Sequence, residues 1–131
     1  MSFIQSMLVL LGRICFAALF LWAALTKIVG WNGTLSYMAS KHIPYPGLFL
    51  AGAICLLIVG SIFLLLGYRA RLGACLLIIF IVPAMCIFHD FWNLNGSARL
   101  TEQIMFMKDV AILGGLLTLA AFGPGRFALN E

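Results

Sequence analysis

Charged side chains are what this sequence has least of, with 8 lysines and arginines and 4 aspartates and glutamates making up 9% of its 131 residues. Soluble domains average about 25% charged residues, and a small domain has a large surface to cover relative to its volume. So few charges exclude an ordinary soluble domain, a secreted disulfide module and a disordered tail. The basic residues also form no run, so the sequence pI of about 9.1 does not indicate nucleic-acid binding.

Clustered metal or redox ligands are also lacking. None of the four cysteines belongs to a C-x-x-C pair, and the two histidines lie far apart in the chain. This pattern predicts no metal site and gives no support to a haem. Free cysteine is a common filler of apolar space, which is the interpretation we favour for these four residues.

What the sequence does contain is long apolar runs, within an overall hydrophobic content of 64%. A membrane-spanning helix needs about 20 mostly apolar residues, and residues 7–28, 47–67, 72–88 and 104–122 meet this requirement. Helices satisfy their backbone hydrogen bonds internally where water is absent. We therefore predict an all-α membrane protein in which residues 1–131 form one domain, a bundle of four transmembrane helices with up-down topology.

The flanking residues predict how the chain is inserted. Arg13 interrupts what would be the apolar core of a signal peptide, so we expect the first helix to be retained. Arg69 and Arg71 lie in a short turn on the same side as both termini, which by the positive-inside rule places the termini in the cytoplasm. In a bacterium this would be a multi-pass protein of the inner membrane. Residues 34–41 are expected to form a short helix at the opposite interface.

Ionisable residues at membrane depth are the strongest functional signal. Each costs roughly 2.5 to 3.5 kcal/mol to insert, so such groups are usually paired and often functional. If the fourth helix begins near Thr101, Asp109 lies about 12 Å along it at about 1.5 Å per residue. We predict that Asp109 forms a buried ion pair with Arg13, while Lys27 or Lys108 extends to the interface.

Two interpretations of these residues stay open. The first is a latch that only fixes the geometry of the bundle, and the second is a polar pocket that handles a proton or binds an anionic or quinone-like headgroup. His89 could exchange protons near neutral pH. The predicted polar pocket comprises Arg13, Lys27, His89, Trp92, Lys108 and Asp109, and no catalytic residue is assigned.

Several short motifs, taken in order, resemble the DoxX family of small four-helix membrane proteins. Individually these motifs are loose, but their order and spacing cover nearly the whole chain. They are Leu11-Gly12-Arg13, Thr26-Lys27, Tyr37-Met38-Ala39-Ser40, Pro44-Tyr45-Pro46, Leu66-Gly67 with Arg71, His89-Asp90-Phe91-Trp92, and the run from Lys108-Asp109 to Leu116-Leu117.

This resemblance implies a link to redox chemistry. The family is named after a subunit associated with thiosulfate:quinone oxidoreductase, and other members are membrane partners of thiol-redox and oxidative-stress proteins. It implies quinone as the cofactor, and a soluble redox protein or an oxidoreductase subunit as the partner. Family members often carry a glutamate in the second helix, where residues 53–57 are apolar here. We expect Asp109 to supply the carboxylate instead.

Two functions therefore follow from the sequence. One is a subunit or partner of a membrane redox system, such as a non-catalytic subunit of a quinone-linked oxidoreductase, that binds quinone or a lipid-like headgroup in the polar pocket. The other is a membrane scaffold or chaperone-like protein whose polar layer is only a latch. In both cases the chain contacts the lipid bilayer and no nucleic acid, and a homo-oligomer is compatible with either. Small-solute transport is disfavoured because four unbroken helices provide no midmembrane site.

Overall fold

The computed structural model describes residues 1–129, which form five α-helices and one 3-10 turn. Four of the α-helices are long and apolar enough to cross a membrane. The elements are α1 Phe3–Val29, α2 Trp31–Ser40, α3 Pro46–Leu66, α4 Ala70–Phe88, η1 Phe91–Asn93 and α5 Gly96–Phe122.

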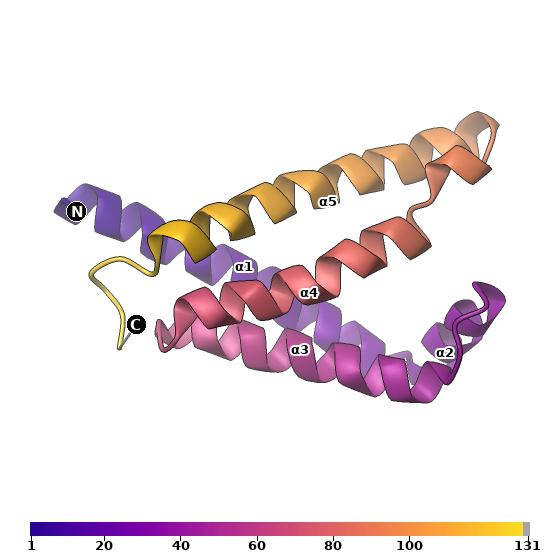
Figure 1. Ribbon diagram of the computed structural model, residues 1–131, viewed down its shortest axis with the longest axis horizontal. Helices are drawn as coiled ribbons and strands as arrows, with labels where there is room; N and C mark the ends of the chain where they lie inside the picture. Colours follow the sequence, from indigo (N-terminus) through magenta and orange to yellow (C-terminus); the bar gives the residue numbers. More distant parts are fainter. Residues whose placement is uncertain (130–131) are drawn as a thin grey trace.

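The four long helices alternate in direction, as an up-down bundle requires (Figure 1). One end of the bundle, which we call the terminal end, holds residues 1–3, the turn at 67–69 and residues 123–129. Helix α2 and the connection at residues 89–95 lie at the other, which we call the loop end. The predicted all-α bundle is thus confirmed. Helix α3 is about 31 Å long at about 1.5 Å per residue, which matches a hydrocarbon core of about 30 Å.

The helices begin earlier than the apolar runs indicated. Helix α1 starts at Phe3 because Ser2 and Gln5 form a reciprocal capping box. Helix α5 starts at Gly96, eight residues before the predicted 104, and its N-cap is Asn95 instead of Thr101. A helix can continue through polar residues once it has left the membrane. The ends of the apolar runs therefore mark where the membrane span ends and not where the helix ends.

The larger of two apolar core clusters joins all four long helices. Its buried side chains recur along α3 and α4 at helical spacing, while most outward side chains of these helices are apolar and exposed. Lipid is the environment that suits such an outer surface. The core residues are Phe20, Ala24, Leu57, Leu64, Ala70, Ala74, Leu77, Ile81, Leu116 and Leu119.

Two glycines set the closest approach in the bundle, between α3 and α4. A Cβ built on Gly73 would lie 2.7 Å from Cβ of Phe63 and 2.9 Å from the carbonyl oxygen of Gly60. A Cβ on Gly60 would lie 2.8 Å from Cγ of Leu77. Small residues allow membrane helices to approach closely, which is where their packing energy arises.

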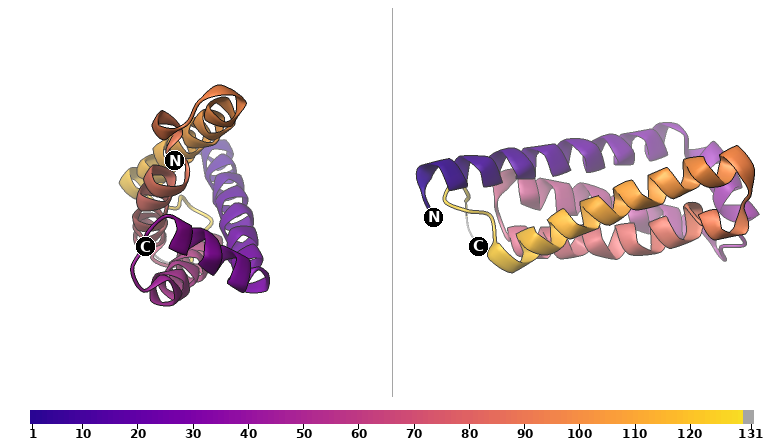
Figure 2. Two further views of the ribbon diagram at one scale, coloured as in Figure 1. Left: turned by 90° about the vertical axis from the view of Figure 1, so that its right-hand side faces the viewer. Right: turned by 90° about the horizontal axis from the view of Figure 1, so that it is seen from above.

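The backbones of α1 and α5, by contrast, stay apart along their length, and side chains such as that of Phe16 fill part of the space between them. No Cα atom of α1 lies within 8 Å of a Cα atom of α5. Figure 1 shows α5 diverging from α1 toward the loop end, and the end-on view in Figure 2 places them on adjacent sides of the bundle. The bundle is therefore less tightly closed between α1 and α5, above all at the loop end.

Candidate functional site: a histidine between two carboxylates

His89 lies where α4 ends, at the loop end of the bundle. Its backbone N–H donates to the carbonyl of Met85 and completes the last turn, and its own backbone then leaves the helical conformation. The chain turns through η1 before α5 returns antiparallel to α4. This path places the imidazole against the face of α5 that looks into the bundle.

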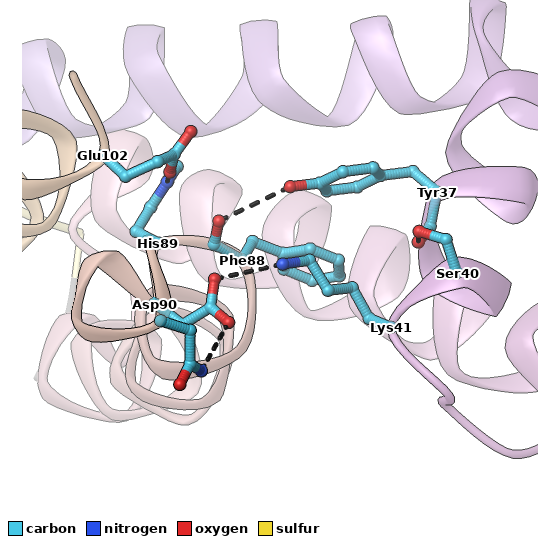
Figure 3. Close-up of polar contacts among 8 residues, drawn as sticks. Tyr37, Ser40, Lys41, Phe88, His89, Asp90 and Glu102 are labelled. Atoms are coloured by element: carbon cyan, nitrogen blue, oxygen red, sulfur yellow. Dashed lines mark hydrogen bonds and ion pairs between the residues drawn. The ribbon is translucent and has the colours of Figure 1, made fainter. Parts of the chain in front are cut away.

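Two carboxylates of α5 lie on either side of that ring. Nδ1 of His89 is 2.6 Å from Oε2 of Glu102, and Nε2 is 3.6 Å from Oδ2 of Asp109. The two acids stand at i and i+7 on α5, so they share one face of the helix. The side chains of His89, Glu102 and Asp109 are 24%, 27% and 22% exposed. We call these three residues the His89 cluster, and Figure 3 shows His89 beside Glu102.

This arrangement is suited to moving a proton. A neutral imidazole has one N–H, whereas the imidazolium has two and a positive charge. Here Glu102 lies within hydrogen-bond distance of Nδ1, and Asp109, at 3.6 Å from Nε2, lies at ion-pair distance only. The cluster can therefore hold a proton on the ring or share it with either acid. The carboxylates approach opposite nitrogens, so they do not converge on one point as metal ligands would. Within residues 1–129 no group of three or more His, Cys, Asp or Glu side chains is arranged to hold a metal ion.

An aromatic group borders the cluster. Phe106 lies between Glu102 and Asp109 along α5, and its ring is 5.7 Å from that of Trp92 and 5.4 Å from that of Phe91, measured between centroids. All three rings meet edge to face, the arrangement that aromatic pairs favour. Trp92, predicted as part of the pocket, thus contacts the same face of α5 as the His89 cluster through Phe106.

A second ion pair fixes the connection that carries His89. Lys41, just after α2, lies 3.0 Å from Oδ1 of Asp90, and Asn93 donates to the other carboxylate oxygen of Asp90 (Figure 3). The Tyr37 ring stacks on Phe88. The hydrogen bond to Asp90 raises the pKa of Lys41, so the ammonium stays charged and paired through neutral pH. The pair is lost as the pH rises through the pKa of Lys41, or as acid protonates the carboxylate of Asp90. Helix α2 thereby holds the end of α4 in place.

The predicted pair between Arg13 and Asp109 is wrong. Arg13 is 1% exposed and lies at the terminal end, where Nη1 donates to the carbonyl of Leu64 at 2.9 Å and Nη2 donates to that of Phe127. Asp109 faces His89 instead. The prediction failed because the last carbonyls of a helix need donors, and those of α3 lie closer to the guanidinium than any acid among residues 1–129.

Close packing around Arg13 explains the glycine beside it. Gly67 ends α3 with a φ of 70°, and a Cβ there would lie 2.5 Å from Nη1 of Arg13. The tail at residues 123–129 covers the same region, since the N–H of Leu129 donates to the carbonyl of Leu66. Arg13 is therefore a latch that joins α1, α3 and the tail.

The two predicted lysines differ in position. Lys27 is half-buried at the loop end, and its ammonium lies 5.5 Å from the centroid of the Phe80 ring, which is a cation–π contact. Lys108 is exposed on the face of α5 that looks away from the bundle, among Ile104, Met107 and Ala111. Neither forms a salt bridge with a residue between 1 and 129.

The structure thus brings together only part of the predicted site. His89 and Asp109 lie together, with Trp92 beside them. Lys27 is on the part of α1 near the same end of the bundle. Lys108 faces outward, and Arg13 lies at the opposite end. The predicted pocket did not include Glu102. The signal that could have found it is the i, i+7 spacing of the two acids.

These features define a multi-pass helical membrane protein with one polar cluster at the end opposite its termini. The sequence model of the DoxX family matches residues 8–90. The chain belongs to the DoxX family.

Similar proteins are known from bacteria and eukaryotes. The chain is 34% identical over 127 residues to inner membrane protein YphA of Escherichia coli, covering 97% of this chain and 91% of that protein. It is 33% identical over 123 residues to inner membrane protein YqjF of the same organism, covering 94% and 89%. A Surfeit locus protein 4 homolog of Schizosaccharomyces pombe is 29% identical over 68 residues, 50% of this chain and 22% of that protein. No solved structure matches the chain significantly.

Proposed function

We propose that this DoxX-family protein is a membrane subunit of a quinone-linked redox system and that the His89 cluster binds the quinone headgroup. The observation that supports this most directly is the contact of Nδ1 of His89 with Glu102 at 2.6 Å, which orients the ring, while Nε2 lies 3.6 Å from Asp109, beyond hydrogen-bond distance, and is left to donate to a ligand. A quinone oxygen accepts hydrogen bonds, and an imidazole with a carboxylate on its far side is a strong, oriented donor.

The surroundings of the cluster fit such a headgroup. Phe106 and Trp92 offer aromatic faces against which a flat ring can stack. The three cluster side chains are partly exposed, and the backbones of α1 and α5 stay apart, so a lipid-soluble molecule could reach them from the bilayer. Lys27, near the loop end of α1, supplies a positive charge inside the bundle, where its ammonium lies over the ring of Phe80.

Reduction of a quinone to a quinol consumes two electrons and two protons. In the proposed role this chain supplies the protons, through His89 and the carboxylates of Glu102 and Asp109. The electrons come from a redox-active partner, a soluble protein or another oxidoreductase subunit. This division of work makes the chain a non-catalytic subunit that positions the headgroup and exchanges its protons.

The location we propose is the bacterial inner membrane, with both termini in the cytoplasm. The two bacterial relatives are described as inner membrane proteins. Both termini lie at the end that carries Arg69 and Arg71, consistent with the positive-inside rule (Figure 1). The His89 cluster would then lie on the periplasmic side.

Quinone binding provides the test. In purified protein with Trp22 and Trp31 replaced by phenylalanine, a short-chain quinone is expected to quench Trp92 fluorescence in a saturable manner. His89→Gln should weaken the apparent Kd about tenfold, the effect of one lost charge-assisted hydrogen bond of about 1.4 kcal/mol or more. Lys108→Gln, which changes a charge on the outward face of the same helix, should leave the Kd unchanged.

Two results would contradict the proposal. One is the absence of saturable quenching in the parent protein, and the other is an equal Kd in the parent and His89→Gln. Equal weakening by His89→Gln and Lys108→Gln would indicate a general charge effect in place of a binding site.

The second candidate function is a scaffold whose polar groups only hold the helices. Two sets of contacts support this alternative because each joins separate segments of the chain. They are the hydrogen bonds of Arg13 with the carbonyls of Leu64 and Phe127, and the ion pair between Lys41 and Asp90. A scaffold predicts that His89→Gln lowers thermal stability in detergent while quinone has no effect on either protein.

A further inference from the structure

Arg13 carries a buried positive charge for which residues 1–129 provide no negative partner. Its acceptors are two neutral carbonyl groups, those of Leu64 and Phe127. Its Nε is fully buried and has no hydrogen-bond partner among these residues. The partial negative charge at the end of α3 offsets some of the cost, but a buried charge normally has an ionic partner.

A crevice lies directly beside this side chain. It has a volume of about 170 Å³ and separates α1 from the last turns of α5 at the terminal end. Its walls include Gly12, Arg13 and Phe16 of α1 and Gly115, Thr118 and Phe122 of α5. The crevice exists because no Cα atom of α1 lies within 8 Å of a Cα atom of α5 and because Gly12 and Gly115 contribute no side chain.

The Arg13 end of the crevice lies just inside the boundary between the hydrocarbon core and the lipid headgroups. The guanidinium bonds to Leu64, two residues before the end of α3, and therefore lies about 3 Å inside the end of that helix at about 1.5 Å per residue. The walls farther from Arg13 are apolar, and the space between α1 and α5 borders the bilayer. A lipid could place an anionic group near Arg13 while its acyl chain stays in the membrane.

We propose that this crevice is a binding site for the oxyanion of a lipid headgroup, which pairs with the unpartnered Nε of Arg13. Nε is buried in the structure, so a bound oxyanion requires side chains that line the crevice, the Phe16 ring among them, to move. A carboxylate and a phosphate share this chemistry, since both accept charge-assisted hydrogen bonds from arginine. The site is separate from the His89 cluster, which lies at the loop end.

Two glycine variants make a matched pair for the test. Gly12 lines the crevice, and Gly114 lies outside it on α5. A Cβ on either would meet nothing within 4 Å, so both positions accept a side chain without a backbone clash. Gly12→Leu fills the crevice and leaves Arg13 in place, whereas Gly114→Leu adds the same side chain elsewhere.

The experiment compares full-length protein in nanodiscs of phosphatidylcholine alone, with oleate, and with phosphatidylglycerol. In the parent and in Gly114→Leu, at least one anionic lipid is expected to raise the melting temperature and to stay bound at one copy per chain in native mass spectrometry. Gly12→Leu should lose both effects. A response to oleate alone identifies a carboxylate ligand, and a response to phosphatidylglycerol identifies a phosphate.

The proposal is overturned by either of two outcomes. One is that neither lipid shifts the melting temperature of the parent protein or stays bound to it. The other is that Gly12→Leu responds as the parent does, which would assign the effect to the net positive charge of the chain.

Discussion

Arg13→Met is expected to lower the free energy of unfolding by about 3 kcal/mol, because it removes two hydrogen bonds from a charged donor, each contributing about 1.5 to 3 kcal/mol. In the variant the carbonyl of Leu64 still accepts a hydrogen bond from the N–H of Gly67 at 3.3 Å. Most of the loss in unfolding free energy therefore comes from the carbonyl of Phe127, whose hydrogen bond with Arg13 connects α1 to the tail. Thermal unfolding in detergent measures the effect. Lys108→Met, which alters an exposed cation, should change stability by less than about 0.5 kcal/mol.

A double-mutant cycle separates this prediction from the rejected ion pair. Residues without contact contribute additively to stability, within about 0.5 kcal/mol. Arg13→Met and Asp109→Asn are therefore expected to be additive, whereas Asp109→Asn and His89→Gln should not be. A coupling of several kcal/mol between positions 13 and 109 would restore the ion pair and refute the geometry described above.

Gly73→Ala should destabilise the bundle by about 1 to 3 kcal/mol, the usual cost of adding a methyl group to a tightly packed contact. The new Cβ would meet the backbone oxygen of Gly60 at 2.9 Å, and backbone cannot turn aside as a flexible side chain can. Helices α3 and α4 must therefore move apart. The measurement is the loss of helical circular dichroism on heating in detergent.

Gly52→Ala is the control for this substitution. Gly52 also lies within α3, but a Cβ there meets nothing within 4 Å. Alanine is the better helix former, so this variant should match or exceed the stability of the parent. Equal stability of Gly52→Ala and Gly73→Ala would show that the glycine contact is not the tightest point of the bundle.

The spans could be predicted because hydropathy records the environment of each segment directly. Length and composition placed all four, and the short helix before Pro44 was also expected, although it begins at Trp31 instead of Thr34. Helix ends were predicted less well, since the caps at Ser2 and Asn95 lie beyond the apolar runs.

The polar contacts could be predicted only in part, because charge type does not determine which partner is nearest. Depth along the helices grouped His89 with Asp109 correctly. It could not show that the tail returns to the terminal end and offers Phe127 to Arg13. Nor could it show that α5 extends far enough beyond the membrane for Glu102 to reach His89.

The return of residues 123–129 to the terminal end also bears on the order of assembly. The ribosome synthesises this segment after all four spans, yet Arg13, in the first span, needs the carbonyl of Phe127. Met1 likewise accepts a hydrogen bond from Arg126. The first helix is therefore synthesised before either carbonyl acceptor of its guanidinium, and the contact with Phe127 forms only after translation has passed the last helix.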